Sequence, residues 1–381
     1  MKRKIVYITG TRADYGLMRP VLNAIKNHPK LDLALIVTGM HLMPEFGKTI
    51  KEIEKDDFDL YKIKETYEKD DKASMARFVG RCINKFVDAF NHVHPDIILL
   101  LGDRGEMLAG AIAGAYMNIP VVHISGGDVS GTVDEPVRHA ITKLSHIHFP
   151  ATKKSAERII RMGEEKWRVH VVGAPGLDTI LNEKMIKPKE IAEKYNLDLS
   201  KPIVLMIQHP VTTESDDAPK QIKQTLEAIV SLKHQTILIY PNADAGGRKM
   251  IKVIKEYEKY PFIKAFKSLP HKEYLSLMKI VDVMLGNSSS GIIEAPSFHL
   301  PVINIGSRQE GRERAGNVID VGYSKNEIIK AIKKALYDKK FKEKVKKCKS
   351  PYGDGKADER IVKILSELKI DKKLLQKRIT Y

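Results

Sequence analysis

The chain has 381 residues, of which 43% are hydrophobic and 30% charged, and it carries a formal net charge of +17. A chain of this length is too long for one ordinary hydrophobic core, so we expect two domains. No run approaches the ~18 apolar residues of a membrane-spanning helix. The short apolar run after the basic start argues against a secretory signal, and two widely separated cysteines argue against structural zinc and for a reducing compartment. We therefore expect a cytoplasmic protein without a membrane partner.

Much of the excess lysine lies late in the chain, in segments 333–347 and 372–377. These segments match no nucleic-acid-binding motif, and we interpret them as solvated helix faces, with no nucleic-acid partner. A basic protein also attracts a dianionic ligand, so the charge fits a nucleotide equally well. A nucleic-acid-binding protein is the alternative from another functional class, and it would bind any duplex with a steep salt dependence.

Apolar runs of strand length alternate with amphipathic segments of helix length along the whole chain. In the first half we expect a helix over 17–25 and strands at 5–9, 33–37, 97–101, 121–124 and 169–172. After a break at 173–176, strands are expected at 203–207, 236–240, 263–266, 281–285 and 301–305. Continuous Val, Ile and Leu runs indicate parallel strands buried on both faces. The sequence therefore predicts an α/β protein of two Rossmann-like, doubly wound domains, at 1–174 and 175–355.

Polar motifs are concentrated where the predicted strands end, in both halves of the chain. Ligands bind beyond the carboxyl ends of strands in such sheets, so two polar edges indicate a cleft between the domains. No GxGxxG follows the first strand and no GxxxxGK occurs, which removes the usual support for nicotinamide chemistry and ATP hydrolysis. The pair His146 and His148 is better explained by alternation on a short strand than by a metal site.

Two carboxylates at predicted element ends are candidates for proton transfer. Asp103 follows the strand at 97–101, where its pKa can be raised, unless it merely caps the next helix. Asp134 begins a helix with Pro136 in its first turn, and Arg138 lies four residues further on the same face. We expect Arg138 to keep Asp134 ionised, which is compatible with a capping role.

The segment Gly286-Asn287-Ser288-Ser289-Ser290-Gly291 has the composition of a phosphate-binding loop. Its small residues let backbone N–H groups approach a phosphate, and a following helix would add a favourable dipole. Glu294 is placed to accept hydrogen bonds from a ribose hydroxyl pair. An ordinary serine-capped turn is the alternative interpretation.

Other candidates for binding or catalysis occupy similar positions. Arg12, in a glycine-flanked turn after the first strand, can clamp a phosphate or carboxylate, unless it is a solvated loop arginine. His209 ends the first strand of the second half. It is either a functional histidine or a structural one whose hydrogen bonds are satisfied within the protein. A later loop carries three arginines, Arg308, Arg312 and Arg314, that could bind an anion or steady a lid. The alternative is that the nearby Glu310 and Glu313 pair with them.

Together, the ordered motifs resemble those of the hydrolysing UDP-N-acetylglucosamine 2-epimerases. They run from about Ile5 to Val321 and comprise GTRADYG, VTGMH, LGDR, HISGGDVSGTVDEPVRHAITKLSHIHF, HPVTTE, YPNADAG, GNSSSGIIEAP and NIGSRQEGRERAGNVIDV. The resemblance implies a GT-B arrangement with the active site in the interdomain cleft and a C-terminal helix at 356–381 that packs back on the first domain. It implies elimination of UDP to a 2-acetamidoglucal and hydration to N-acetylmannosamine, as in sialic-acid biosynthesis, with no metal and no other cofactor. A homodimer is expected by family analogy only.

The resemblance also identifies candidate residues by their positions in these motifs. Many family members carry a glutamate where this chain has Ser125, which puts the identity of the sugar in doubt. Our hypothesis is that Asp128 joins the other two aspartates in the carboxylate chemistry and that Ser125 orients the acetamido group or a water. The candidate catalytic residues are Asp103, Ser125, Asp128, Asp134 and His209. The candidate substrate- and UDP-binding residues are Arg12, Arg138, Asn242, Ser288, Ser289, Ser290, Gly291, Glu294 and Arg312.

Three other enzyme functions stay open on the sequence. A non-hydrolysing epimerase would release a nucleotide sugar instead of free sugar and UDP. A UDP-N,N'-diacetylbacillosamine 2-epimerase of legionaminic-acid synthesis would use the same motifs on a 6-deoxy diacetamido sugar. A GT-B glycosyltransferase is disfavoured because no acceptor site is apparent.

Overall fold

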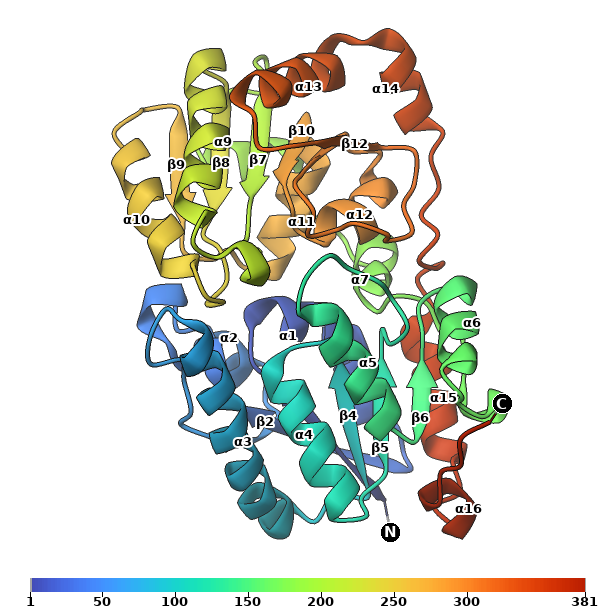
Figure 1. Ribbon diagram of the computed structural model, residues 1–381. Coiled ribbons are helices and arrows are strands. Elements are labelled where there is room, and N and C mark those ends of the chain that lie inside the picture. The colour runs from blue at the N-terminus through green and yellow to red at the C-terminus, as the bar shows by residue number, and fades with distance from the viewer. Residues whose placement is uncertain (1, 381) are drawn as a thin grey trace.

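The computed structural model describes residues 2–380, which form two lobes, each built on a six-stranded parallel sheet (Figure 1). The first sheet has the order β3-β2-β1-β4-β5-β6 and the second the order β12-β11-β10-β7-β8-β9. The strands of the first sheet are β1 (Arg3–Thr9), β2 (Leu31–Val37), β3 (Asp59–Lys62), β4 (Ile97–Leu101), β5 (Val121–Ile124) and β6 (Ile147–Phe149). The strands of the second are β7 (Ile203–Ile207), β8 (Gln235–Ile239), β9 (Ile263–Phe266), β10 (Val283–Gly286), β11 (Val302–Ile305) and β12 (Val318–Val321).

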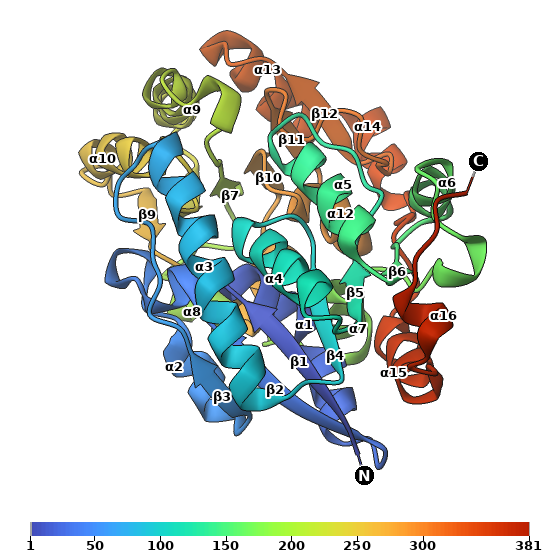
Figure 2. The ribbon, with the colours of Figure 1, turned by 60° about the horizontal axis from the view of Figure 1, so that its bottom comes forward.

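Helices cover both faces of each sheet, as the continuous apolar strands require (Figures 1 and 2). In the first lobe they are α1 (Arg12–Lys26), α2 (Ile50–Ile53), α3 (Lys72–Val93), α4 (Gly105–Tyr116), α5 (Asp134–Leu144) and α6 (Lys153–Arg161). Then follow α7 (Gly176–Asn182), α8 (Pro188–Lys194), α9 (Ala218–Leu232), α10 (Gly247–Tyr257), α11 (His271–Ile280), α12 (Ser290–Ile293), α13 (Lys325–Tyr337) and α14 (Lys339–Lys346). The chain ends with α15 (Ala357–Glu367) and α16 (Lys372–Leu375).

The sheet of the first lobe separates two hydrophobic cores because alternate side chains of each strand enter opposite sides. In β1, Ile5 and Tyr7 belong to one core, and Val6 and Ile8 belong to the other. The second lobe repeats the arrangement around β7. Both sheets are therefore buried on both faces, and their polar side chains are left to the strand ends.

One predicted strand is wrong. The stretch 169–172 forms only an isolated bridge between His148 and Val169, and Val171 is exposed, so it lies outside the sheet. The sequence analysis did not predict β3 or β12. These two edge strands carry no fully buried residue, so they lack the continuous apolar pattern of the central strands.

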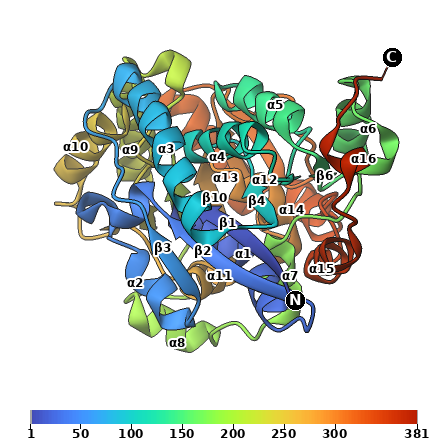
Figure 3. The same cartoon turned by 90° about the horizontal axis from the view of Figure 1, so that it is seen from below.

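The chain passes between the lobes twice, and the two crossings lie side by side. The backbone N–H of Ala174 donates to the carbonyl of Tyr352 at 2.7 Å, and Gly173 and Gly353 both have positive φ. After the second crossing, α15 packs against α1, and Ile361 joins the core of the first lobe (Figure 3). The boundary at 174/175 stays a prediction. Among residues 2–380, no helix has the length and apolar composition needed to cross a membrane.

Candidate active site

Segments that follow the strands of the two sheets contact each other directly, so the two lobes are closed. Nη1 of Arg12, after β1, donates to Oγ of Ser268, after β9, at 2.8 Å. Nη2 of Arg308, after β11, donates to Oδ2 of Asp134 at 3.3 Å. The loop before α5 reaches the second lobe, where the N–H of Gly131 donates to the carbonyl of Arg308 (Figures 1 and 2).

Asp103 lies after β4 and pairs with Arg138 of α5, whose guanidinium is buried and donates to Oδ2 of Asp103. Burial alone would raise the pKa of Asp103, but the guanidinium of Arg138, with Arg312 and Arg308, brings it below its ordinary value. The expected raised pKa is therefore wrong. The capping alternative is also wrong, because Arg104 is the N-cap residue of α4 and no side chain caps that helix.

Asp134 is the first residue of α5, as predicted, but its cationic partner is a different one. Arg138 is turned towards Asp103, and Arg308 of the second lobe contacts the Asp134 carboxylate instead. Burial, and then the negative charge of Asp103, raise the pKa of Asp134. Two adjacent carboxyl groups thus have pKa values shifted in opposite directions, a pattern that separates proton donors and acceptors in enzymes.

Asp128 and Ser125 lie on the loop that follows β5. Oδ1 of the buried Asp128 accepts a hydrogen bond of 2.6 Å from Oγ of Ser155, and its Oδ2 lies 3.8 Å from Nη2 of Arg312. Ser125 has a left-handed φ of 60° and donates its N–H to the carbonyl of Phe149. Asp128 is therefore anchored by neighbours, whereas the side chain of Ser125 is only half-buried.

Arg312 is half-buried, but two nitrogen atoms of its guanidinium, Nε and Nη1, are fully buried. Within the described part of the chain, its Nε and Nη1 atoms have no hydrogen-bond partner. Desolvated donors without partners are costly, so this guanidinium is suited to a ligand carbonyl or anion. Its neighbour Asp128 supplies the nearest negative charge.

His209 follows β7 and is held as a neutral hydrogen-bond donor. The backbone N–H of Asn242 donates to Nδ1 of His209, which leaves the ring proton on Nε2. Burial, and then the charges of Arg308 and Arg104, bring the pKa of His209 well below its ordinary value. In the region 2–380, Oδ1 of Asn242 has no partner, while its amide nitrogen donates to Asp244.

The serine loop begins at a position that only glycine can occupy. Gly286 has a φ of 128°, and a Cβ there would lie 1.9 Å from the carbonyl oxygen of Ile207. The side chain of Asn287 then accepts from the N–H of His209 at 2.7 Å and donates to its carbonyl at 2.9 Å. The loop is therefore fixed to the end of β7, beside His209.

The helix expected after the serine loop is short. Its four residues, α12, lead directly into a 3₁₀ turn at Ala295–Phe298. Ser288 and Ser289 are half-buried, while Ser290 is buried and accepts from the hydroxyl of Tyr274 at 2.6 Å. A phosphate would therefore be bound by local backbone N–H groups, with little contribution from a helix dipole. A Cβ at Gly291 would lie 2.8 Å from Val302, so a side chain there would crowd β11.

Glu294 is a buried carboxyl group with one free oxygen. Its Oε2 accepts from Oγ of Ser290, and its Oε1 finds no partner among residues 2–380. Burial raises the pKa of Glu294 to about 7. Such a group suits a ligand that brings its own hydroxyl donors.

Arg12 does not contact the serine loop. Its guanidinium pairs with Glu52 of the first lobe and donates to Ser268 of the second. Burial lowers the pKa of Arg12 to about 10, although Glu273 acts in the opposite direction. It joins the lobes at the edge of the site, and its predicted phosphate contact stays a prediction.

The sequence analysis did not assign a site role to two residues that the fold brings to this site. Arg308 was weighed only as one of three loop arginines, yet it contacts Asp134 and, at 3.4 Å, the carbonyl of Asn287. Gln309 donates to the same carbonyl at 2.9 Å. The alternative, in which Glu310 or Glu313 pairs with the loop arginines, is wrong, since the acidic partners of these arginines are Asp134, Asp128 and Asp320. The SRQ sequence after a buried strand was the available signal.

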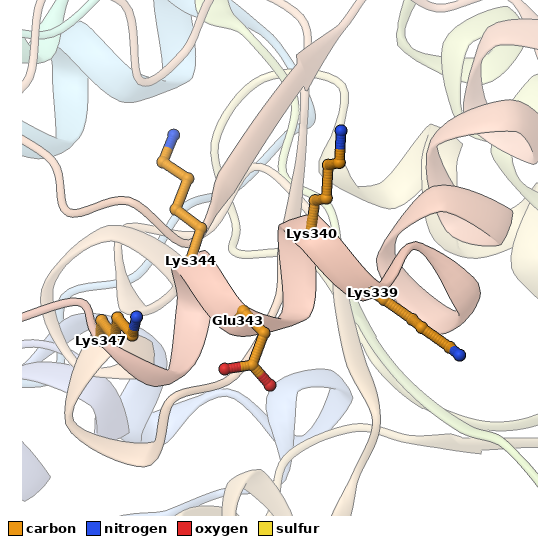
Figure 4. A pocket seen from close by; sticks show the side chains of 5 residues that line it. All are labelled: Lys339, Lys340, Glu343, Lys344 and Lys347. Atoms are coloured by element: carbon orange, nitrogen blue, oxygen red, sulfur yellow. The ribbon is translucent and has the colours of Figure 1, made fainter.

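A hollow of about 440 Å³ lies on the surface of the second lobe, at α14 (Figure 4). Its lining residues are Lys339, Lys340, Glu343, Lys344 and Lys347. These side chains are exposed, which matches the solvated helix face expected from the sequence. No group of three or more His, Cys, Asp or Glu residues within 2–380 has a metal-binding arrangement.

Comparison with known proteins gives consistent matches over nearly the whole chain. A family model described as UDP-N-acetylglucosamine 2-epimerase matches residues 23–366. A Legionella pneumophila protein named UDP-N,N'-diacetylbacillosamine 2-epimerase (hydrolyzing) is 46% identical over 382 residues, covering all of both chains. A Neisseria meningitidis UDP-N-acetylglucosamine 2-epimerase is 38% identical over 342 residues, or 89% of each chain.

Solved structures agree on the fold. The crystal structure of a UDP-GlcNAc 2-epimerase from Neisseria meningitidis bound to UDP-GlcNAc matches with a TM-score of 0.79 at 22% identity. The match covers 95% of this chain and 99% of that one. The two lobes therefore have the GT-B arrangement that the resemblance implied.

Proposed function

Since this chain belongs to the UDP-N-acetylglucosamine 2-epimerase family, we propose that it is a hydrolysing 2-epimerase of a UDP-linked 2-acetamido sugar. One observation carries the proposal. Arg308 contacts both the Asp134 carboxylate of the first lobe, at 3.3 Å, and the Asn287 carbonyl of the serine loop, at 3.4 Å. A candidate acid–base group and the candidate diphosphate site thus lie within reach of one side chain.

The first chemical step is an elimination. The C2–H bond of the sugar breaks, its proton passes to an enzyme carboxylate, a C1–C2 double bond forms, and the C1–O bond releases UDP. Because the C2 proton is weakly acidic, UDP departure must run ahead, and the charge that develops on the diphosphate needs stabilisation. Backbone N–H groups of the serine loop and the Nε2–H of His209 are donors of the right kind.

We assign the proton transfer at C2 to Asp134. A base works best when its pKa is near the working pH, and burial with the Asp103 charge moves Asp134 in that direction. Asp103, held ionised by Arg138, is a weaker base and is better suited to orient water and stabilise positive charge at C1. Water then adds at C1 of the glucal, and a proton reaches C2 from the opposite face. The products are UDP and the free 2-epimer.

The remaining polar groups divide between nucleotide and sugar. The free Oε1 of Glu294 is our candidate acceptor for the ribose hydroxyls. Asn242, with its free Oδ1, is assigned to the nucleotide side beside His209. Arg312 and Asp128 are assigned to the sugar, with Ser125 oriented towards an acetamido group or a water.

For the sugar we favour UDP-N,N'-diacetylbacillosamine. The relative that carries this name matches the whole chain at 46% identity, whereas the UDP-N-acetylglucosamine 2-epimerase of Neisseria meningitidis matches 89% of it at 38%. UDP-N-acetylglucosamine, giving N-acetylmannosamine for sialic-acid synthesis, is the second candidate. A homodimer is part of the proposal, on family resemblance alone.

The experiment supplies each UDP-sugar separately and follows UDP and sugar products by ion-exchange chromatography. The proposal expects stoichiometric UDP and a free 2-epimer, with the higher kcat/KM for the diacetamido substrate. Asp134→Asn is the matched control, because it changes one oxygen and should abolish both products. Release of a 2-epimeric nucleotide sugar would assign the non-hydrolysing activity instead. A preference for UDP-N-acetylglucosamine would assign the second substrate.

A further inference from the structure

The side chain of Arg308 is the bridge between the two halves of the site. Its Nη2 reaches Oδ2 of Asp134, its Nη1 reaches the carbonyl of Asn287, and its own carbonyl accepts from the N–H of Gly131. Arg308 belongs to the second lobe and Asp134 to the first, 174 positions apart in the sequence. This contact therefore exists only when the lobes are closed.

Asp134 is surrounded by charges of both signs. Asp103, from the end of β4, and Asp244, from the loop before α10, face it with negative charge. Arg308 is the cation that contacts its carboxylate, while Arg138 is engaged by Asp103. Without Arg308, a second buried carboxylate beside Asp103 would be strongly disfavoured in its ionised form.

We propose that Arg308 is a positioning residue that brings, from the second lobe, the counter-charge that keeps Asp134 ionised when the closed lobes bury it. This inference rests on the proposed function, since it assigns a base role to Asp134. Burial in the closed arrangement raises the pKa of Asp134, and Arg308, which comes from the second lobe, opposes that rise. The base thus stays available in the state in which the lobes enclose the substrate and exclude bulk water.

The contact with Asn287 connects this device to the nucleotide side. The carbonyl of Asn287 precedes the serines of the loop, and Gln309 holds the same carbonyl. Arg308 is thereby oriented by the loop that we assign to the diphosphate. A loop ordered by UDP would keep Arg308 in place, so nucleotide binding would help to keep Asp134 ionised.

The test uses the pH dependence of kcat in Arg308→Met, Arg308→Lys and Arg248→Met. Arg248 is the matched control because it also crosses the lobes, to Glu45 at 2.9 Å, without touching Asp134. Arg308→Met should move the acidic limb of the kcat profile to higher pH by about one unit. Arg308→Lys should restore most of the limb, and Arg248→Met should leave its position unchanged. A uniform loss of kcat at all pH values, or a raised KM with an unmoved limb, would overturn the proposal.

A second readout does not depend on turnover. The Asp134 carboxyl carbon is titrated by ¹³C NMR with UDP bound, and its signal is identified by its loss in Asp134→Asn. Arg308→Met should raise the Asp134 midpoint relative to the wild type, and equal midpoints would contradict the inference. Absence of products from the wild type would instead reject the proposed function, and the NMR titration would still decide the role of Arg308.

Discussion

The backbone N–H of Asn242 donates to Nδ1 of His209 at 3.1 Å, and this one bond fixes which ring nitrogen of the histidine faces outward as a donor. With burial and two arginines disfavouring a second proton, His209 has a pKa well below its usual range and stays neutral at working pH. It can donate a hydrogen bond to the departing diphosphate without adding a titration of its own.

His209→Ala should therefore lower kcat by about a hundred- to a thousand-fold, the usual effect of removing one donor from developing negative charge. The loss should be the same from about pH 6 to pH 8, because a neutral imidazole does not titrate there. Steady-state kcat profiles of wild type and variant measure both effects. A histidine signal that titrates near its ordinary pKa in NMR, assigned by its loss in His209→Ala, would contradict the neutral-donor role.

The two aspartates should differ in their effect on stability. Asp103→Asn leaves the buried guanidinium of Arg138 without its counter-charge, which costs about 3–5 kcal/mol for a buried pair. Asp134→Asn removes a carboxyl group that burial and Asp103 disfavour as an anion, and its partner Arg308 keeps its hydrogen bond to the Asn287 carbonyl, so the loss of stability should be smaller. Thermal unfolding of the two variants at neutral pH compares them directly. Equal melting temperatures would refute the assignment of Arg138 to Asp103.

Glu294 should make stability depend on pH. Its pKa is raised to about 7 in the folded protein, so between its ordinary value and about 7 the folded state holds a proton that the unfolded state releases. Stability from this group is therefore present at low pH and is lost as pH rises through that window. Glu294→Gln should remove the loss, which is on the order of 3 kcal/mol at most. Melting temperatures of both proteins at pH 5 and pH 8 provide the measurement.

Glu294 should also distinguish nucleotides by their sugar. Its Oε1 has no hydrogen-bond donor among residues 2–380, and a ribose hydroxyl would supply one. UDP should therefore bind more tightly than its 2'-deoxy analogue. Glu294→Gln should reduce that difference while leaving the diphosphate contacts in place. Titration calorimetry with both nucleotides tests this, and an unchanged preference in the variant would exclude Glu294 from ribose recognition.

Arg312 should act on the sugar and not on UDP. Its Nη2 faces Asp128 of the first lobe, and its Nε and Nη1 have no partner within residues 2–380, whereas Arg308 and Gln309 are the arginine and glutamine that contact the serine loop. Arg312→Met should raise KM for the UDP-sugar about ten-fold or more, the effect of losing a charge-assisted hydrogen bond, with the Kd of UDP nearly unchanged. Arg248→Met is again the control, since Arg248 joins the lobes through Glu45 and contacts neither Arg312 nor Asp128. A parallel loss of UDP affinity would transfer Arg312 to the nucleotide side.

The central strands were predictable from sequence because burial on both faces leaves continuous apolar runs, as in β4 and β7. The edge strands β3 and β12 lack that signature, and 169–172 has it without joining a sheet. Charge pairing was the harder problem. The four-residue spacing suggested Arg138 for Asp134, but the actual partners are Asp103, 35 positions away from Arg138, and Arg308, 174 positions away from Asp134. Helix periodicity gives neighbours along one element and does not reveal contacts made by lobe closure.

The most direct measurement follows the reaction by proton NMR in deuterated water with UDP-N,N'-diacetylbacillosamine and UDP-N-acetylglucosamine in turn. If carboxylates of one lobe act on a sugar whose diphosphate is held by the other, one of these substrates yields UDP and a free 2-epimer with a single deuterium at C2. Retention of the original C2 hydrogen in a released sugar, or failure of both substrates to react, would contradict the account.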